Sequence, residues 1–330
     1  MIEATNIKTG YILTAGKQKI VSENLNFTIH SGALTAMLGA NGSGKSTLIK
    51  TLCGFIPPLA GNVLLNGKPI NKYTKNSLAK AVGVVLTDRP SDGGLTVYDL
   101  VSLGRYPYTG YFGTLSKVDH EIVEDAIEKL GLTHLKSSFI SRISDGERQK
   151  VMIAKIIAQQ CQTIILDEPT AFLDVKSRLE TYSLLHKIAH DYDKTVLLST
   201  HDLEITLRHA DRLLIISSDK TLKSGTTEDL IMAGDIKTLF TDSKSSNITF
   251  NQVDGAFRIK PNYKFRVFVE GEEKYLFWLR NALIRNSIEP CNDTSAEINI
   301  TIETPTKIIV NKTNVYSSVD ALISDLSKMQ

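Results

Sequence analysis

Residues 39–46 read Gly39-Ala-Asn-Gly-Ser-Gly-Lys-Ser46 and fit the pattern G-x-x-x-x-G-K-[ST]. The apolar run Leu34–Leu38 before them predicts a buried strand, and Thr47–Cys53 after them predicts a helix. A glycine-rich loop that runs from a strand into a helix N-terminus turns backbone N–H groups and partial positive charge toward an anion. The sequence therefore predicts a loop that wraps the phosphates of ATP or GTP.

Most residues of this loop are expected to contact the phosphates or the Mg²⁺ ion. The glycines let backbone N–H groups face the phosphates, and the Ser46 hydroxyl can ligate Mg²⁺. Lys45 can reach the β- and γ-phosphates and is expected to stabilise the charge that develops there during hydrolysis. The residues predicted to contact the nucleotide are Gly39, Asn41, Gly42, Gly44, Lys45, Ser46 and Thr47.

The composition is that of an ordinary globular protein. The 330 residues, 42% hydrophobic and 22% charged, indicate about two domains. A net charge of +2 without a basic block argues against a nucleic-acid partner. Cys53, Cys161 and Cys291 are widely spaced, which predicts reduced thiols, the first two in the core. No paired cysteine or histidine spacing typical of a structural metal site stands out, so none is expected.

The chain shows no sign of its own membrane insertion. The segment Met1–Asn6 has neither a basic region nor an apolar run, so no secretion signal is expected. Apolar runs such as Val82–Leu86 and Leu213–Ile216 are far shorter than the roughly 20 residues of a membrane span. A membrane role would therefore depend on partners.

Strands and helices alternate along residues 1–240, which predicts a doubly wound α/β core with a mostly parallel sheet. The expected strands are Ile2–Lys8, Ile20–His30, Leu34–Leu38, Gly61–Gly67, Val82–Leu86, Thr163–Asp167, Thr195–Ser199 and Arg212–Ile216. The expected helices are Thr47–Cys53, Lys117–Gly131, Glu147–Gln160, Lys176–His190 and one from Leu203. In the second of these helices, the expected buried stripe consists of Val118, Ile122, Ala126 and Leu130.

The pattern changes after residue 240. Residues 241–247 are polar and serine-rich and are predicted to be a linker, and 248–330 are predicted to be a small α+β domain. Its expected elements are the strands Phe265–Val269, Glu297–Ile302 and Lys307–Val310 and the helices Lys274–Asn286 and Val319–Lys328. This domain lacks paired carboxylates, clustered histidines and a glycine-rich loop, so we expect it not to be catalytic. Binding a regulator, stabilising a dimer and merely covering the surface all stay open.

Two carboxylates follow a second apolar strand. The run Thr163–Leu166 brings Asp167 and Glu168 to the carboxyl edge of the predicted sheet, where open α/β sheets bind ligands. Asp167 is expected to hold Mg²⁺, and Glu168 is expected to orient or deprotonate an attacking water. The structural alternative is an acidic strand end that caps the next turn.

Three further features are weaker when each is taken alone. Ser144-Asp-Gly-Glu-Arg148 opens a helix and offers a second anion-binding end, although it also reads as a simple helix cap. His201 follows an apolar strand, where a neutral imidazole can donate to a γ-phosphate oxygen or be an ordinary surface residue. Tyr11 is placed where its ring can stack on a base or pack against its neighbours.

Together and in this order, the motifs of residues 1–240 resemble the nucleotide-binding subunit of ABC transporters. Gly39–Ser46 is similar to the Walker A loop, and Ile164–Glu168 is similar to Walker B with its catalytic glutamate. Ser144–Glu147 resembles the family's signature motif, Phe172–Asp174 its D-loop and His201 its switch histidine. The resemblance implies the ABC cassette fold of P-loop NTPases, with an antiparallel β subdomain and a helical subdomain over about 90–160.

The resemblance also implies partners. In that family two subunits pack head to tail, and each ATP lies between the Walker loops of one and the signature motif of the other. Ser144 and Gly146 are then expected to contact a nucleotide in trans, with Asp174 nearby. Two transmembrane permease subunits are implied, and indirectly a substrate-binding protein. The implied location is peripheral, at the cytoplasmic face of the bacterial inner membrane.

The sequence departs from the family pattern at two places. The signature reads Ser-Asp-Gly-Glu rather than Ser-Gly-Gly-Gln, so Asp145 brings a carboxylate near the partner's phosphates. The family's Q-loop glutamine, which touches Mg²⁺ and couples the site to the permease, is replaced by Thr87. Thr87 is expected to keep only a shorter hydroxyl contact with the metal.

One stretch of the sequence favours a particular subgroup of ABC transporters. Leu95–Tyr108, and Gly104-Arg-Tyr-Pro107 in particular, is similar to the region that docks the permease in importers of iron–siderophore, haem and cobalamin complexes. We therefore expect an importer ATPase. An exporter subunit shares every catalytic motif and stays open as an alternative, as does, at lower rank, a soluble ABC-type ATPase that acts on ribosomes or nucleic acid.

Overall fold

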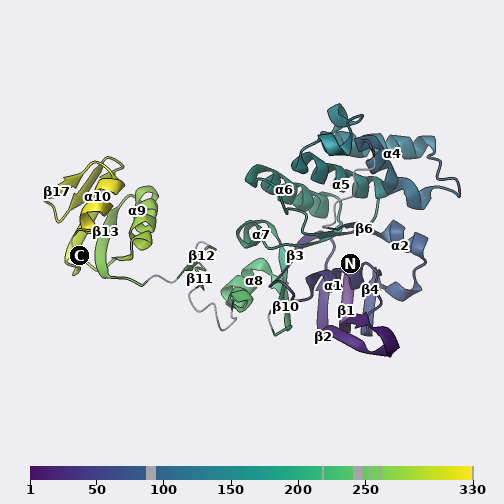
Figure 1. Cartoon of the computed structure of the whole chain (residues 1–330), viewed down its shortest axis with the longest axis horizontal. Coiled ribbons are helices and arrows are strands. Elements are labelled where there is room, and N and C mark those ends of the chain that lie inside the picture. Colours follow the sequence, from purple (N-terminus) through teal and green to yellow (C-terminus); the bar gives the residue numbers. More distant parts are fainter. Residues whose placement is uncertain (87–93, 218, 241–247, 253–254, 260–261, 329–330) are drawn as a thin grey trace. The chain divides into compact units, whose positions relative to one another are not determined.

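The computed structural model describes residues 1–330 except 87–93, 218, 241–247, 253–254, 260–261 and 329–330 (Figure 1). The chain divides into two compact units, Met1–Ser246 with Phe250–Ala256, and Asn247–Thr249 with Phe257–Gln330. The predicted linker at 241–247 lies outside the described residues. No helix of the described part is both long and apolar enough to cross a membrane.

A six-stranded sheet forms the centre of the first unit, in the order β10-β9-β3-β8-β7-β6. Its strands are β3 (Ala33–Gly39), β6 (Val82–Val85), β7 (Thr163–Asp167), β8 (Thr195–Ser199), β9 (Arg212–Ile216) and β10 (Leu222–Thr226). All neighbours pair in parallel except β10, which runs antiparallel to β9. Every residue of β7 and β8 is buried, as expected for strands covered on both faces. The carboxyl ends of β3, β8 and β7 therefore lie side by side.

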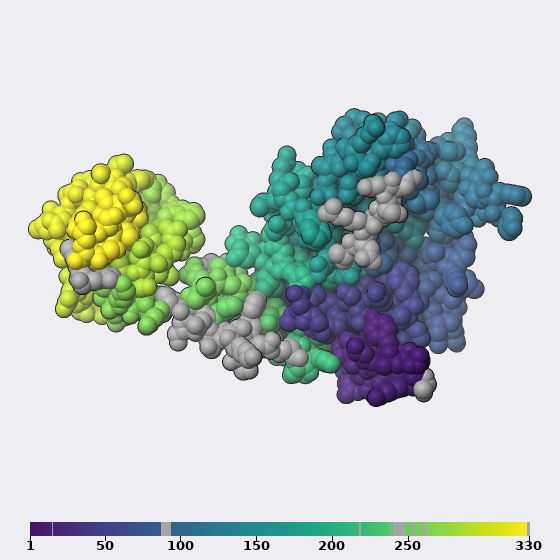
Figure 2. Space-filling model, in the orientation of Figure 1, coloured from purple at the N-terminus to yellow at the C-terminus, as the bar shows by residue number. Residues whose placement is uncertain are grey.

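A second, antiparallel sheet has the order β2-β1-β4-β5 and carries Tyr11. Its strands are β1 (Ile2–Ile12), β2 (Gln18–Ile29), β4 (Ala60–Leu65) and β5 (Lys68–Pro69), with the short helices η1 (Thr14–Gly16) and η2 (Ile70–Lys72) beside them. Apolar residues of this sheet share one core with α1 (Lys45–Leu52) and with the central sheet. In Figure 2 the purple surface of residues 1–30, which include β1 and β2, lies at the lower end of the first unit, and the teal surface lies at its upper end.

Helices dominate residues 75–160. They are α2 (Lys75–Ala81), α3 (Val97–Ser102), η3 (Leu103–Tyr108), α4 (Lys117–Lys129), η4 (Thr133–Leu135), η5 (Ile140–Arg142) and α5 (Asp145–Gln159). The stripe predicted for α4 is confirmed at Ala126 and wrong at Val118, which is 61% exposed; the buried apolar residues of α4 are Val123, Ala126 and Ile127. Four residues turn a helix by about 400°, so a row at every fourth position drifts out of the core.

The segment Gly104-Arg-Tyr-Pro107 is partly internal. A Cβ atom at Gly104 would lie 2.2 Å from the Lys155 carbonyl oxygen, so η3 packs backbone to backbone on α5. Arg105 is 4% exposed, and its Nε donates to Asp119 Oδ1 at 2.8 Å. Tyr106, by contrast, is 70% exposed. Within this segment, Gly104 and Arg105 hold the helices together and Tyr106 is available to a partner.

The remaining helices of the first unit are α6 (Val175–Asp191), α7 (Leu203–His209), α8 (Thr227–Met232) and η6 (Asp235–Phe240). The Tyr182 hydroxyl, buried in α6, lies 2.6 Å from Thr206 Oγ1 of α7 and joins the two helices. Cys53 and Cys161 are buried, as predicted. Burial raises the pKa of Cys53 to about 12 and that of Cys161 to about 11, so both thiols stay protonated at neutral pH.

The second unit is a five-stranded sheet with two helices. Its sheet order is β14-β13-β15-β16-β17. The elements are β13 (Phe265–Gly271), α9 (Glu273–Arg285), β14 (Ile288–Cys291), β15 (Ile298–Thr304), β16 (Lys307–Val310), β17 (Asn314–Tyr316) and α10 (Val319–Leu326). Leu276, Leu279 and Leu283 of α9 are buried in its core, as predicted. Ahead of it, β11 (Ile248–Phe250) and β12 (Phe257–Ile259) form a two-stranded sheet.

Candidate functional site

The loop between β3 and α1 depends on glycine for its shape. Gly42 and Gly44 have φ values of 78° and 104°, where other residues are strained. A Cβ at Gly44 would also lie 2.7 Å from Val21 Cγ1. Gly44 caps α1 without a side chain, so the first N–H groups of the helix stay open to an anion. A Cβ at Gly39 would lie 2.6 Å from Ser43 Oγ, so the loop also closes tightly at its start.

Lys45 curls over this loop. Its Nζ donates to the carbonyl oxygens of Gly39 at 2.8 Å and Ala40 at 3.2 Å. Burial lowers the pKa of Lys45, while the nearby charges of Glu168 and Asp167 oppose that shift. The cation and the two predicted carboxylates therefore share one electrostatic site.

The polar residues around the loop fit a phosphate. Within the part of the chain that the structure describes, Ser43 Oγ is buried without a hydrogen-bond partner, and a hydroxyl in an anion-binding loop can donate to a phosphate oxygen. Asn41, Gly42 and Ser46 are exposed to an incoming ligand. Thr47 is buried, and its Oγ1 lies 3.2 Å from the Tyr11 hydroxyl, which places Tyr11 beside the start of α1.

Ser199 holds the carboxylate of Asp167 and the backbone of Glu168. Ser199 Oγ donates to Asp167 Oδ1 at 2.5 Å and accepts from the Glu168 N–H at 3.0 Å. Glu168 has a φ of 52°, a left-handed conformation that costs a non-glycine residue roughly 1–3 kcal/mol. The strained turn directs the Glu168 side chain away from the strand, toward His201. A serine hydroxyl and a buried carboxylate at a strand end are oxygen ligands of the kind that Mg²⁺ prefers, so Ser46 and Asp167 fit that ion.

His201 reaches Glu168 directly, with 2.5 Å between Nε2 and Oε1. Both residues line a surface hollow of about 340 Å³, together with Thr170, Phe172, Arg178 and Asp202. The Arg178 guanidinium donates to Asp202 at 2.8 Å and to the Leu173 carbonyl, so it ties the segment after β7 to the segment after β8. Glu168 and His201, two of the three residues predicted to be catalytic, thus line the same hollow.

The predicted signature motif lies next to Asp174, the last residue of the predicted D-loop. Ser144 caps α5, where its Oγ accepts from the Glu147 N–H, and the Glu147 carboxylate accepts from the Ser144 N–H at 2.8 Å. A Cβ at Gly146 would lie 2.6 Å from Ser177 Oγ, which itself donates to Asp174 Oδ2 at 3.1 Å. Hydrogen bonds from Ser177 hold the pKa of Asp174 below its usual value.

Within the described residues, no hydrogen bond or ion pair joins Ser144 to the phosphate loop of its own chain. The last predicted metal contact, Thr87, lies outside the described residues. Ser43, Arg178 and Ser199 were missed by sequence reasoning. Ser199 had a usable signal, since it ends an apolar strand two residues before His201.

Comparisons with known proteins agree with this geometry. Residues 22–171 match the family model of the ABC transporter, and residues 264–327 match that of the iron ABC transporter C-terminal domain. An uncharacterized ABC transporter ATP-binding protein of Methanocaldococcus jannaschii is 37% identical over 79% of this chain and 88% of its own length. A solved metal-chelate type ABC transporter in an inward-facing conformation has a TM-score of 0.62 and 29% identity, covering 72% of this chain and 88% of its own.

Two relatives have more specific names. The iron(3+)-hydroxamate import ATP-binding protein of Bacillus subtilis is 34% identical over 67% of this chain and 82% of its own length. The ferric enterobactin transport ATP-binding protein of Escherichia coli is 34% identical over 73% of this chain and 89% of its own length.

The fold and the loop thus define a P-loop ATPase of the ABC cassette type. The chain belongs to the family of ABC transporter ATP-binding proteins, and its second unit carries the iron ABC transporter C-terminal domain. The predicted family, fold and ATPase activity are confirmed.

Proposed function

We propose that this chain is the ATP-hydrolysing subunit of an importer for a chelate of the iron–siderophore, haem or cobalamin type. The observation that carries this proposal is the match of residues 264–327 with a domain of iron ABC transporters, because an exporter would share only the cassette. Two relatives named for iron(3+)-hydroxamate import and ferric enterobactin transport support it.

For hydrolysis, we assign each residue a role from its position. The loop N–H groups and Lys45 bind the phosphates of ATP, and Ser46 and Asp167 would hold Mg²⁺, which would neutralise charge on the β- and γ-phosphates. Glu168 orients the attacking water and accepts its proton, and His201 positions the Glu168 carboxylate at 2.5 Å. Lys45 and His201 stabilise the charge that develops on the γ-phosphate.

We further propose that two copies close head to tail around ATP. Ser144 lies at the exposed N-terminus of α5, a helix of 15 residues whose positive end suits a phosphate in trans. Because Gly146 has no side chain, Ser177 of α6 fits beside it, and Ser177 donates to Asp174. Asp174 therefore lies on the same face as the signature motif. Hydrolysis would remove charge from this interface and let it open.

The expected membrane partners are two permease subunits, with a substrate-binding protein engaged indirectly. Three aromatic side chains near the end of η3 support a docking role, since Tyr106, Tyr111 and Phe112 are 70%, 99% and 89% exposed. Exposed aromatic residues are typical anchors of protein interfaces. Such docking would hold the chain at the cytoplasmic face of the bacterial cell membrane.

Uptake measurements test the proposed cargo class. A strain that lacks this chain would be supplied with radiolabelled ferric hydroxamate, haem or cobalamin, and complemented with the unchanged chain or with Glu168→Gln. We expect the unchanged chain alone to restore uptake of one of these chelates. Restored efflux of a compound without restored uptake would instead establish the exporter alternative, and salt-sensitive RNA or DNA binding would support the soluble ATPase.

A further inference from the structure

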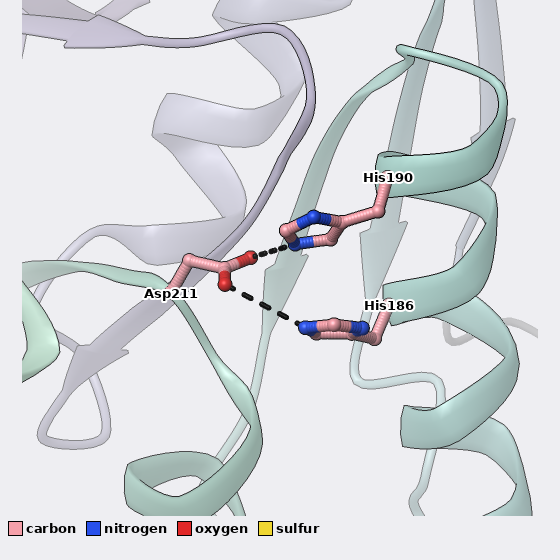
Figure 3. A group of neighbouring side chains, drawn as sticks. All are labelled: His186, His190 and Asp211. Carbon is pink, nitrogen blue, oxygen red and sulfur yellow. Dashed lines mark hydrogen bonds and ion pairs between the residues drawn. The ribbon is translucent and has the colours of Figure 1, made fainter.

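Two histidines of α6 and one aspartate face one another (Figure 3). His186 and His190 stand four residues apart, so their side chains leave the same face of the helix. Both rings point at the carboxylate of Asp211, which directly precedes β9. The spacing of the two histidines is visible in the sequence, which corrects the expectation that no such pair occurs, whereas only the fold brings Asp211 to them.

The separations suit a single metal ion. His190 Nε2 lies 3.0 Å from Asp211 Oδ2, and His186 Nε2 lies 3.6 Å from Asp211 Oδ1. Metal–ligand bonds of 2.0–2.2 Å in a tetrahedron put neighbouring ligand atoms about 3.4 Å apart. The two measured distances lie on either side of that value, and the three ligand atoms all lie within 4.8 Å of one another.

The ligands are also held in place. The Leu34 N–H donates to Asp211 Oδ2 at 2.7 Å, and the Asp211 N–H donates back to the Leu34 carbonyl at 3.0 Å, which pins the carboxylate to β3. The two imidazole rings stack with their centroids 4.1 Å apart and an angle of 21°. Hydrogen-bonded carboxylates and restrained imidazoles are typical supports of metal ligands.

The chemistry of the group selects the class of ion. Imidazole suits Zn²⁺, Cu²⁺ and Ni²⁺, whereas Mg²⁺ takes oxygen ligands, so the Mg²⁺ of a nucleotide would not compete. The side chains of His186 and His190 are each 43% exposed, so an ion can enter and a water can complete its coordination. His186 and His190 follow Asp174, the N-cap of α6, by 12 and 16 residues. At about 1.5 Å per residue, they lie about 18–24 Å along the helix from Asp174.

We propose that His186, His190 and Asp211 form a binding site for one divalent transition-metal ion. Zn²⁺ is the ion with which the site is tested. The bound ion would tie the C-terminal half of α6 to the start of β9, and through Leu34 to the strand that leads into the phosphate loop. The site is separate from the nucleotide site and does not depend on the proposed transport function.

The test uses the full chain without a purification tag, with excess Mg²⁺ and a non-hydrolysable ATP analogue to occupy the nucleotide site. Calorimetric titration with Zn²⁺ is expected to show one ion per chain. At 100 times the dissociation constant, the melting temperature should rise by about 5 °C or more. His186→Gln combined with His190→Gln should weaken binding at least 10-fold and reduce the rise to about half or less at the same Zn²⁺ concentration.

Two control variants test whether other histidines account for the Zn²⁺ binding. His134→Gln removes an exposed histidine of η4, and His201→Gln removes the histidine beside Glu168, and both should bind Zn²⁺ as the unchanged chain does. Co²⁺ should give strong visible absorption bands of a tetrahedral ion in the unchanged chain and not in the double variant. Equal Zn²⁺ affinity in the double variant, or no Zn²⁺ binding to the unchanged chain, would overturn the proposal.

Discussion

His201 Nε2 lies 2.5 Å from Glu168 Oε1, although 32 residues separate the two in the chain. The contact follows from the sheet order, because β7 and β8 are neighbours, Glu168 comes directly after β7 and His201 is the second residue after β8. At the expected position of the γ-phosphate, the Glu168 carboxylate and the His201 imidazole would therefore already be in contact.

The substitution Glu168→Gln should abolish turnover and preserve ATP binding. It keeps the size of the side chain and removes the base, so the rate should fall about 10²- to 10⁴-fold. Phosphate release measures the rate, and gel filtration with Mg²⁺ and ATP should show a trapped dimer. Full turnover by this variant would contradict the role assigned to Glu168.

The substitution His201→Ala should lower kcat about 10²-fold and leave KM for ATP nearly unchanged. The reason is that His201 is assigned to positioning Glu168 and to stabilising developing charge, rather than to binding the ground state. Steady-state kinetics would separate the two parameters. A rise in KM with constant kcat would show that His201 serves binding alone.

The substitution Ser144→Asp separates the cap of α5 from the proposed contact in trans. Aspartate is as good a helix cap as serine, so the melting temperature should be nearly unchanged, whereas Ser144→Ala should cost about 1 kcal/mol. The new charge would face the partner's phosphates, so the ATP-dependent dimer of a Glu168→Gln background should be lost. Dimerisation equal to that of the background would contradict a contact between Ser144 and phosphate.

The buried pair Arg105–Asp119 should make stability depend on pH in acid. Hydrogen bonds from Ser116, and then the Arg105 guanidinium, lower the pKa of Asp119 to about 2, from 3.8 in an unperturbed carboxyl. A lowered pKa stabilises the fold fully above about pH 4, and this stabilisation is lost as the pH falls toward 2. The loss should amount to about 2 kcal/mol.

Urea unfolding between pH 5 and pH 2 would measure this effect. We expect Asp119→Asn to flatten the acid dependence. The matched control is Asp99→Asn, because Asp99 holds the same capping position on α3 and is exposed. An unchanged acid slope in Asp119→Asn would show that this carboxylate is not responsible.

Segments with a clear apolar run were predictable from sequence, and some short helices were not. β3, β7, β8 and β9 appear where their apolar runs stand. Helices such as α2 and α8, of seven and six residues, were missed because two turns carry too little periodicity. The stripe of α4 was placed partly wrongly because every fourth position rotates by about 40° around the helix, so such a row leaves the buried face.

The residue order by itself determined the phosphate loop, the two carboxylates after β7 and the family, since these depend on local backbone rules and on types of side chain. Only the tertiary structure decided that Ser199 contacts the Asp167 carboxylate and the Glu168 backbone, that Gly104 packs on α5 and that Asp211 meets two histidines. The physical reason is that these contacts join segments distant in sequence, and the packing of buried strands and helices sets which segments become neighbours.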